Sequence, residues 1–287
     1  MTFSIVARSP DGRAHGVAVA SKFLAVGAAV PAGEAEVGAL ATQSYANLAY
    51  RPQGLTLLRT GVGAGAVVAG LTAADDGRAS RQLGVVGAAG DGATYTGSEC
   101  HPWAGGVAGD GYAIQGNILA GPQVVAEMER AWTASAGEAR LARRLFAALR
   151  AGDAAGGDRR GRQSAALLVL ARGMGYGGTS DVVVDLRVDD HPDPINELGR
   201  LLDLHTLYFE RPDPATTLPL DAELGAEVRD RLARLGHRGA EGGDGLDATL
   251  IDWAGIENLE ERMVAGRIDP LVLARLRELT PADRMDA

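Results

Sequence analysis

The chain has 287 residues, of which 46% are hydrophobic and 23% are charged. These proportions are typical of a folded soluble protein and exclude an intrinsically disordered or fibrous chain. The formal net charge is −9, so no excess of basic residues exists to neutralise a phosphate backbone, and we expect no nucleic-acid partner.

Cysteine content and the N-terminal sequence bear on the compartment. A single cysteine, Cys100, cannot form an internal disulfide, which is typical of a reducing compartment. Residues 1–11 lack the basic start and apolar run of a signal peptide, and no apolar stretch reaches the roughly 18 residues of a membrane-spanning helix. We therefore expect a cytoplasmic protein with no membrane partner.

The chain is rich in small residues, with 40 glycines and only 5% aromatic residues. Small side chains let backbone layers approach closely, so we expect closely packed sheets. The same composition suits contacts between subunits, and we expect a homo-oligomer.

The predicted elements begin with a β-hairpin formed by residues 3–7, the turn Ser9–Gly12 and residues 16–21. Further strands are predicted over residues 37–43, 81–88, 93–96, 112–116, 164–171 and 182–188, and helices over residues 52–60, 63–73, 122–135, 138–151 and 194–209. Asp193 is the predicted N-cap of the last helix, and Pro194 is its first residue. Runs of strands followed by pairs of helices indicate a layered α+β fold.

A composition change marks a second domain. Residues 210–220 contain three prolines and are predicted to be a linker. The pattern beyond it is helical throughout, with helices predicted over 221–235, 259–265 and 270–279, the last capped by Asp269. We therefore divide the chain into a domain of residues 1–210 and a linker with a small all-α domain, residues 211–287.

Thr2 is a candidate nucleophile. Threonine at position 2 is small enough for methionine aminopeptidase to remove Met1, which would make Thr2 the mature N-terminus. A free α-amine has a pKa of about 7.7–8.0, so it can accept the proton of the Thr2 hydroxyl. The alternative is that threonine after Met1 has no catalytic meaning, as in many cytoplasmic proteins.

Lys22 is a candidate partner of Thr2. It is the single lysine among 28 lysine and arginine residues, and lysine can perform chemistry that arginine cannot. If paired residue numbers in the hairpin sum to about 22, Thr2 lies opposite Ala20 with Lys22 as its diagonal neighbour. Lys22 would then lower the pKa of the Thr2 hydroxyl or amine, and Lys22→Arg would prevent acylation of Thr2. A register shorter by one residue would bring Ser21 close instead, and Lys22 would equally fit an isolated surface position.

Six segments resemble the family catalogued as domain of unknown function 1028, whose members are grouped with the N-terminal nucleophile (Ntn) hydrolases. They read MTFSIVAR (residues 1–8), GVAVASKF (16–23), ATQSYAN (41–47), QGNILAG (115–121), AGGDRRGRQS (155–164) and VDDHPDP (188–194). The resemblance covers about residues 1–210 and implies a four-layer αββα sandwich, without a substrate. Residues 252–262 (DWAGIENLEER) with Ile268 and Asp269 resemble a small helical peptidoglycan-binding module that often follows this family. A cytoplasmic cap or an oligomerisation element fits these residues equally well.

Further candidate site residues lie at predicted strand ends. Asn117 ends a strand, where its amide and nearby backbone N–H groups would stabilise an oxyanion, although Gly-Asn is also ordinary turn chemistry. The candidate substrate-binding residues are Gln43, Tyr45, Asn47, Asp158, Arg159 and Arg162. An arginine among them would bind a substrate carboxylate, and a structural ion pair in a solvated loop is the alternative.

Residues 189–193 contain three aspartates and one histidine, which would suit a metal-dependent hydrolase. Because Asp193 is accounted for as an N-cap, we predict no metal site, and we predict no cofactor. His101 beside Cys100 matches neither a thiol-protease motif nor a zinc spacing, and we expect it to be buried or to cap a helix.

Two functional hypotheses follow. The first is an Ntn-type amidohydrolase in which Thr2 attacks an amide or related C–N bond of a small molecule, Lys22 tunes Thr2, and Asn117 binds the oxyanion. The second is a non-catalytic binding protein on the same fold, with peptidoglycan fragments bound by the C-terminal module. A retained Met1 or an inert Thr2 hydroxyl would favour binding.

Overall fold

The computed structural model describes residues 2–239 and 243–281, and the chain divides into two compact units. The first unit ends at Leu201 and the second begins at Leu202. The division falls within helix α6 (Pro194–Phe209), because Leu207 and Tyr208 near its end pack against the core of the second unit. Mixed strands and helices form the first unit, and helices dominate the second, in agreement with the predicted α+β class.

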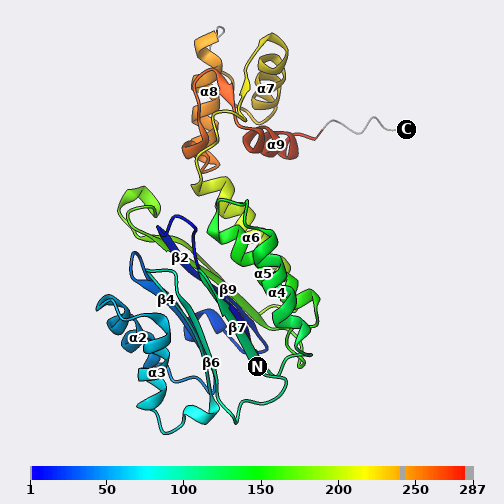
Figure 1. Ribbon diagram of the computed structural model, residues 1–287. Helices are drawn as coiled ribbons and strands as arrows, with labels where there is room; N and C mark the ends of the chain where they lie inside the picture. The colour runs from blue at the N-terminus through cyan, green and yellow to red at the C-terminus, as the bar shows by residue number, and fades with distance from the viewer. Residues whose placement is uncertain (1, 240–242, 282–287) are drawn as a thin grey trace. The chain divides into compact units, whose positions relative to one another are not determined.

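In the described part of the first unit, two antiparallel β-sheets lie face to face (Figure 1). The larger sheet has the strand order β10 (Val182–Val188), β9 (Ser164–Ala171), β2 (Ala14–Ser21), β1 (Thr2–Arg8), β8 (Tyr112–Asn117) and β7 (Gly105–Gly109). The smaller sheet has the order β3 (Pro31–Glu34), β4 (Gly38–Ser44), β5 (Arg81–Gly87) and β6 (Gly92–Thr96). The hairpin predicted at the N-terminus is β1 with β2.

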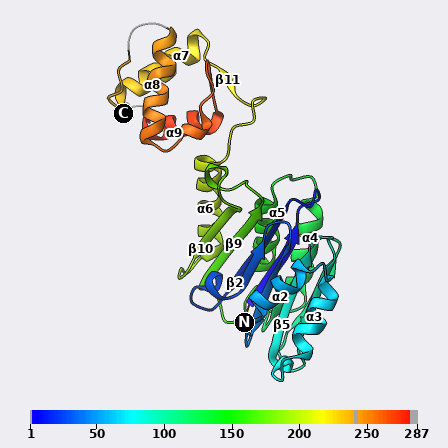
Figure 2. The ribbon, with the colours of Figure 1, turned by 90° about the vertical axis from the view of Figure 1, so that its left-hand side faces the viewer.

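Helices cover the outer face of each sheet, so the layers run helix, sheet, sheet, helix (Figures 1 and 2). The helices α4 (Gln123–Ala134) and α5 (Leu141–Ala154) pack on the larger sheet, and α2 (Tyr50–Arg59) and α3 (Ala64–Ala73) on the smaller one. In α5, Leu141, Leu145 and Leu149 recur at helical spacing and form the buried face. The short helix α1 (Val26–Ala29) connects β2 to β3.

The two sheets pack against each other through small side chains. The cluster of buried residues at this interface consists of valine and alanine: Val6, Val17, Val19, Val26, Val30, Ala39, Ala41, Val86, Ala113 and Ala166. Such side chains fill little space, so the backbones of facing strands lie close together. The close sheet packing expected from the composition is therefore present.

The interface between the sheets changes from apolar to polar along its length. Alternate residues of a strand face the same side, and along β2 these are His15, Val17, Val19 and Ser21, all buried. The positions at the Ser21 end of the neighbouring strands are also polar and buried: Thr2, Ser4, Gln43, Gln82, Gln115 and Asn117. One end of the space between the sheets is therefore lined by hydroxyl and amide groups.

The second unit contains α7 (Ala222–Arg234), α8 (Gly243–Ile256), α9 (Pro270–Leu279) and a short sheet of β11 (Leu218–Pro219) with β12 (Arg267–Ile268). These elements surround the fully buried Trp253. Asp269 caps α9 as predicted, since its carboxylate accepts a hydrogen bond from Leu271 N at 2.6 Å. The same carboxylate pairs with the buried Arg262 at 2.6 Å.

Several predicted elements need correction. Residues 259–265 were predicted as a helix but contain a 3-10 turn (Glu260–Arg262) that precedes β12, so the second unit is not helical throughout. β3, β7 and α8 were not predicted as individual elements. In the hairpin Phe3 pairs with Ala20, so paired numbers sum to 23 and not to 22.

His15 makes the first unit sensitive to acid. Burial, with a smaller contribution from the positive charge of Arg8, lowers the pKa of His15 from 6.5 to about 4. The unfolded chain therefore binds a proton that the folded chain does not between these values, and stability falls as the pH drops from 6.5 to 4, by roughly 3 kcal/mol in all. We expect the protection factors of the β1–β2 hairpin amides, which correct for the slower intrinsic exchange at low pH, to fall over this range, and His15→Leu to remove most of this fall.

The matched control is His191→Leu, which removes an exposed histidine. This variant should keep the pH response of the parent chain. An unchanged response in His15→Leu would show that His15 is not the group that titrates.

Candidate functional site

A pocket of about 780 Å³ opens at the polar end of the space between the sheets. Its polar lining includes Thr2, Ser21, Gln43 and Asn117, which lie at or close to the ends of β1, β2, β4 and β8. Its apolar lining includes Phe23, Val26, Val30, Leu48 and Ile118, and Arg81, His101 and Arg160 also line it. The strand ends of both sheets thus meet at one cavity.

Thr2 lies at the centre of this polar lining. It is the first residue of β1 and is placed between Ser21 of β2 and Asn117 of β8, with which it is paired in register. Its Oγ1 lies 3.1 Å from Ser21 Oγ, and its carbonyl oxygen accepts a hydrogen bond from Gln43 Nε2 at 3.2 Å. Contacts from both sheets therefore fix Thr2 at the pocket, and the contact with Ser21 holds its hydroxyl.

Buried amides connect the two sheets at this end. Gln82 Oε1 accepts hydrogen bonds from Gln43 Nε2 at 2.8 Å and from Asn117 Nδ2 at 2.9 Å. Gln82 Nε2 donates to Gly116 O at 2.7 Å, and Ser4 Oγ donates to Gln43 Oε1 at 2.6 Å. Because these groups are buried, breaking one of the hydrogen bonds would leave a polar atom with neither a protein partner nor water. The free-energy cost of that loss keeps Gln43 and Asn117 in fixed positions.

The residue after each of these two amides has a left-handed backbone. Ser44 has φ 69° and Ile118 has φ 50°, and both line the pocket. A positive φ is especially unfavourable for a β-branched residue such as isoleucine. Backbone bonds hold Ile118 in place, since its N–H donates to His101 O at 2.9 Å and its carbonyl accepts from Arg159 N at 3.3 Å. Strained residues of this kind are concentrated at binding and active sites.

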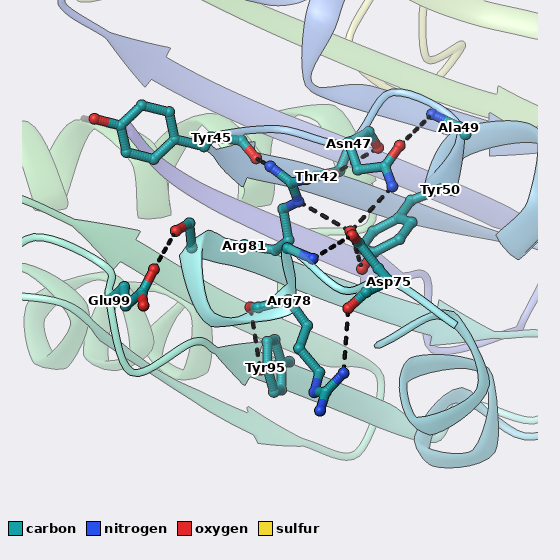
Figure 3. Close-up of polar contacts among 12 residues, drawn as sticks. Thr42, Tyr45, Asn47, Ala49, Tyr50, Asp75, Arg78, Arg81, Tyr95 and Glu99 are labelled. Carbon is teal, nitrogen blue, oxygen red and sulfur yellow. Dashed lines mark hydrogen bonds and ion pairs between the residues drawn. The ribbon is translucent and has the colours of Figure 1, made fainter. Parts of the chain in front are cut away.

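Asp75 holds the segment that forms one side of the pocket (Figure 3). Its Oδ2 accepts hydrogen bonds from Arg81 Nε at 2.9 Å, Tyr50 OH at 2.9 Å and Asn47 Nδ2 at 3.0 Å. Arg81 in turn donates from Nη1 to Tyr45 O at 2.6 Å. The hydrogen bond from Arg81 is the main reason that the pKa of Asp75 lies far below its usual range. The carboxylate therefore stays charged and anchors residues 45–50 at all but strongly acidic pH.

The structure brings several predicted site residues together and separates others. Thr2, Gln43, Tyr45 and Asn117 all line the pocket. Tyr45 is exposed at its rim, where its hydroxyl lies 3.4 Å from His101 Nε2. Asn47 does not line the pocket and instead bonds to Asp75 and to the backbone of Ala49.

Asp158, Arg159 and Arg162 do not line this pocket. Asp158 and Arg162 line another cavity, of about 370 Å³, with Phe3 and Ala20 on the opposite face of the larger sheet. Arg162 is bound there to Asp153 through two hydrogen bonds of 2.7 and 2.9 Å. Arg159 is exposed and lines neither of the two cavities.

The observed register changes the neighbours expected for Thr2. Ser21, and not Lys22, lies beside the Thr2 hydroxyl, because a shift of one residue turns the next side chain to the other face of the sheet. Lys22 is exposed and donates from Nζ to Arg162 O at 3.2 Å. His101, expected to be buried or to cap a helix, is exposed and lines the pocket.

A metal-binding cluster or a membrane-spanning helix in residues 2–239 and 243–281 would indicate another kind of site. Within these residues no three His, Cys, Asp or Glu side chains are grouped so that they could hold a metal ion, and this includes residues 189–193. Among the same residues no helix is both long and apolar enough to span a membrane.

Comparison with known proteins places the chain in a family. Residues 2–198 match the family described as "Family of unknown function (DUF1028)". The chain belongs to the DUF1028 family. A crystal structure of a DUF1028 protein from Silicibacter pomeroyi is similar, with 35% sequence identity and a TM-score of 0.64 over 71% of this chain and 89% of that one. Residues 208–276 match the family described as "Putative peptidoglycan binding domain", and no curated protein matches the chain.

Sequence reasoning did not assign Gln82, His101 and Arg160 to this DUF1028 site, and it named Ser21 only as the alternative neighbour of Thr2. Strand alternation contains a signal for two of them. Ser21 lies two residues beyond the inward-facing Val19, and Gln82 faces the same way as Val86 on β5. His101 and Arg160 lie outside the strands, where no periodicity indicates which way a side chain points.

Replacing Asp75 should loosen this side of the DUF1028 pocket. Asp75→Asn removes the charge that binds Arg81, so we expect hydrogen exchange of residues 44–50 to accelerate about tenfold at neutral pH, the effect of losing one charge-assisted bond. Exchange in the β1–β2 hairpin should stay unchanged.

The neighbouring Asp76 is exposed and provides a matched control as Asp76→Asn. Equal acceleration in both variants would mean that general charge, and not the Asp75–Arg81 contact, determines the mobility of this segment.

Proposed function

We propose that the chain is an Ntn-type amidohydrolase with Thr2 as its nucleophile and a small amide as its substrate. The helix, sheet, sheet, helix order of layers supports assignment of the first unit to the Ntn sandwich. The observation that carries the proposal is the position of Thr2, whose hydroxyl is fixed at the wall of a pocket by Ser21 and lies opposite Asn117.

The proposed reaction uses the Thr2 amine as its base. Thr2 Oγ1 attacks the amide carbon while the amine accepts the hydroxyl proton. The C–N bond then breaks, and the amine returns that proton to the leaving nitrogen, which leaves an ester on Thr2. Water, deprotonated by the same amine, hydrolyses the ester and releases the acid. The mechanism requires Thr2 to be the first residue of the mature chain, and Met1 lies outside the described residues.

Other residues would position Thr2 or bind developing charge. Asn117 Nδ2 already donates to Gln82, which fixes the amide, and its second N–H is our candidate donor to the oxyanion. Ser21 is a positioning residue for the Thr2 hydroxyl, and Gln43 is one for the Thr2 carbonyl. Lys22 has no role in this mechanism, because its Nζ is bonded to Arg162 O. The reaction needs no cofactor.

A β-lactone that acylates N-terminal threonines tests the proposal. Mass spectrometry of the intact protein and of its N-terminal peptide should show that Met1 is absent and that one adduct lies on Thr2. Thr2→Ala should give no adduct, and Thr2→Ser should retain it. Asn117→Ala should slow acylation about a hundredfold, the usual cost of losing an oxyanion donor.

Lys22→Arg is the matched control and should be acylated at the rate of the parent chain. A retained Met1, or an adduct on Cys100 alone, would contradict the proposed nucleophile.

A family match in the second unit supports an additional function, which is binding. The match of residues 208–276 to a peptidoglycan-binding family supports the proposal that this unit binds peptidoglycan fragments. We expect the full chain to co-sediment with purified peptidoglycan, to be released by soluble muropeptides, and not to co-sediment with cellulose. Equal recovery with both polymers, or no recovery with peptidoglycan, would reject this function for the second unit.

A further inference from the structure

Two arginines line the pocket beside Thr2, although the chain as a whole is acidic. The sequence has 37 aspartate and glutamate residues against 28 lysine and arginine residues. The described residues that line the pocket nevertheless include Arg81, Arg160 and His101, and no aspartate or glutamate. A concave site with this distribution of charge attracts anions.

Arg81 forms hydrogen bonds with other residues of the protein. Its Nε donates to Asp75 and its Nη1 to the carbonyl of Tyr45. The ion pair is mostly shielded from solvent, since the Asp75 side chain is only 12% exposed. Arg81 therefore shapes the pocket wall, and its charge is compensated by Asp75.

The Arg160 side chain is more exposed than that of Arg81. It lines the pocket, and 45% of its side-chain surface is exposed. Its Nη2 lies 3.4 Å from Asp158 Oδ2, a longer contact than the 2.7 and 2.9 Å bonds of Arg162 to Asp153. The Asp158 carboxylate also accepts two backbone N–H groups at 2.8 Å each. Asp158 thus orients the Arg160 side chain, and the exposed part of a guanidinium so placed can form charge-assisted bonds to an incoming anion.

The remaining wall of the pocket is apolar. Phe23 and Leu48 are 54% and 51% exposed, and Val26 and Val30 lie deeper in the same lining. Exposed large apolar side chains that line a concave site indicate an apolar part of the ligand. The pocket therefore combines an apolar wall with an exposed arginine.

We propose that this pocket binds a small organic anion that carries an apolar group, and that Arg160 binds the anionic group. The substrate assignment, unlike the anion site, rests on the proposed function: the substrate would be an amide with such an anionic group, for example an N-acylated amino acid. Arg159 and Arg162, the arginines expected from the sequence to bind a carboxylate, are replaced in this role by Arg160. A guanidinium accepts carboxylate and phosphate alike, so both anions are tested.

Calorimetric titration of the full chain tests the proposal without requiring turnover. The probes are N-acetyl-leucine, its neutral analogue N-acetyl-leucinamide, and phenyl phosphate. We expect at least one anion to bind about tenfold more tightly than the neutral amide, and Arg160→Ala to abolish this preference. Arg159→Ala, which removes the same charge from an exposed neighbour that does not line the pocket, should keep it.

The outcomes separate this inference from the proposed nucleophile. Thr2→Ala should keep the preference for the anion, whether or not the parent chain is acylated by the β-lactone. If neither anion binds more tightly than the neutral amide, or if Arg159→Ala and Arg160→Ala lose the preference equally, the inference fails. If the preference holds and no acylation of Thr2 occurs, the anion site stands and the hydrolase proposal fails.

Discussion

The site depends on hydrogen bonds between buried amides of two sheets. Gln82 accepts from Gln43 of its own sheet and from Asn117 of the facing sheet, so one carbonyl oxygen fixes side chains from both layers. These bonds require the sheets to lie close together. Gly84 meets this requirement on β5, because a Cβ there would come within 2.1 Å of Gln115 Oε1. The high glycine and alanine content therefore serves the site as well as the core.

The apolar middle of the sheet interface and its polar end contribute differently to the free energy of unfolding. Valine and alanine in the middle exclude water and stabilise the unit, while buried hydroxyl and amide groups at the pocket end gain little net free energy from their bonds. The left-handed backbones of Ser44 and Ile118 add strain at the same end. The stability gained in the well-packed middle must therefore offset the free-energy cost of the buried polar groups and the backbone strain at the site. Such a division explains why polar residues gather at one end and are not spread along the interface.

Most of the first unit was predictable because its strands are strongly patterned. The hairpin, β9 and β10 matched their predicted bounds closely, whereas the four-residue β3 and the glycine-rich β7, which pair with β4 and β8, were not predicted. Within the site, Thr2 and Asn117 could be expected at strand ends, but their neighbours depend on register. A shift of one residue replaces Lys22 by Ser21, and no propensity in the sequence distinguishes the two registers.

The residues that line the pocket limit which group could act as the base in the proposed hydrolysis. Its polar lining around Thr2 is made of neutral hydroxyl and amide groups, and the described lining contains no carboxylate. His101 is present, but at the rim, where it contacts the Tyr45 hydroxyl. The α-amine of a mature Thr2 would have an ordinary pKa of about 7.7–8.0, and its distance from the hydroxyl is fixed by covalent bonds. Removal of the preceding residue would therefore create the base, so N-terminal processing and catalytic competence become a single event in this mechanism.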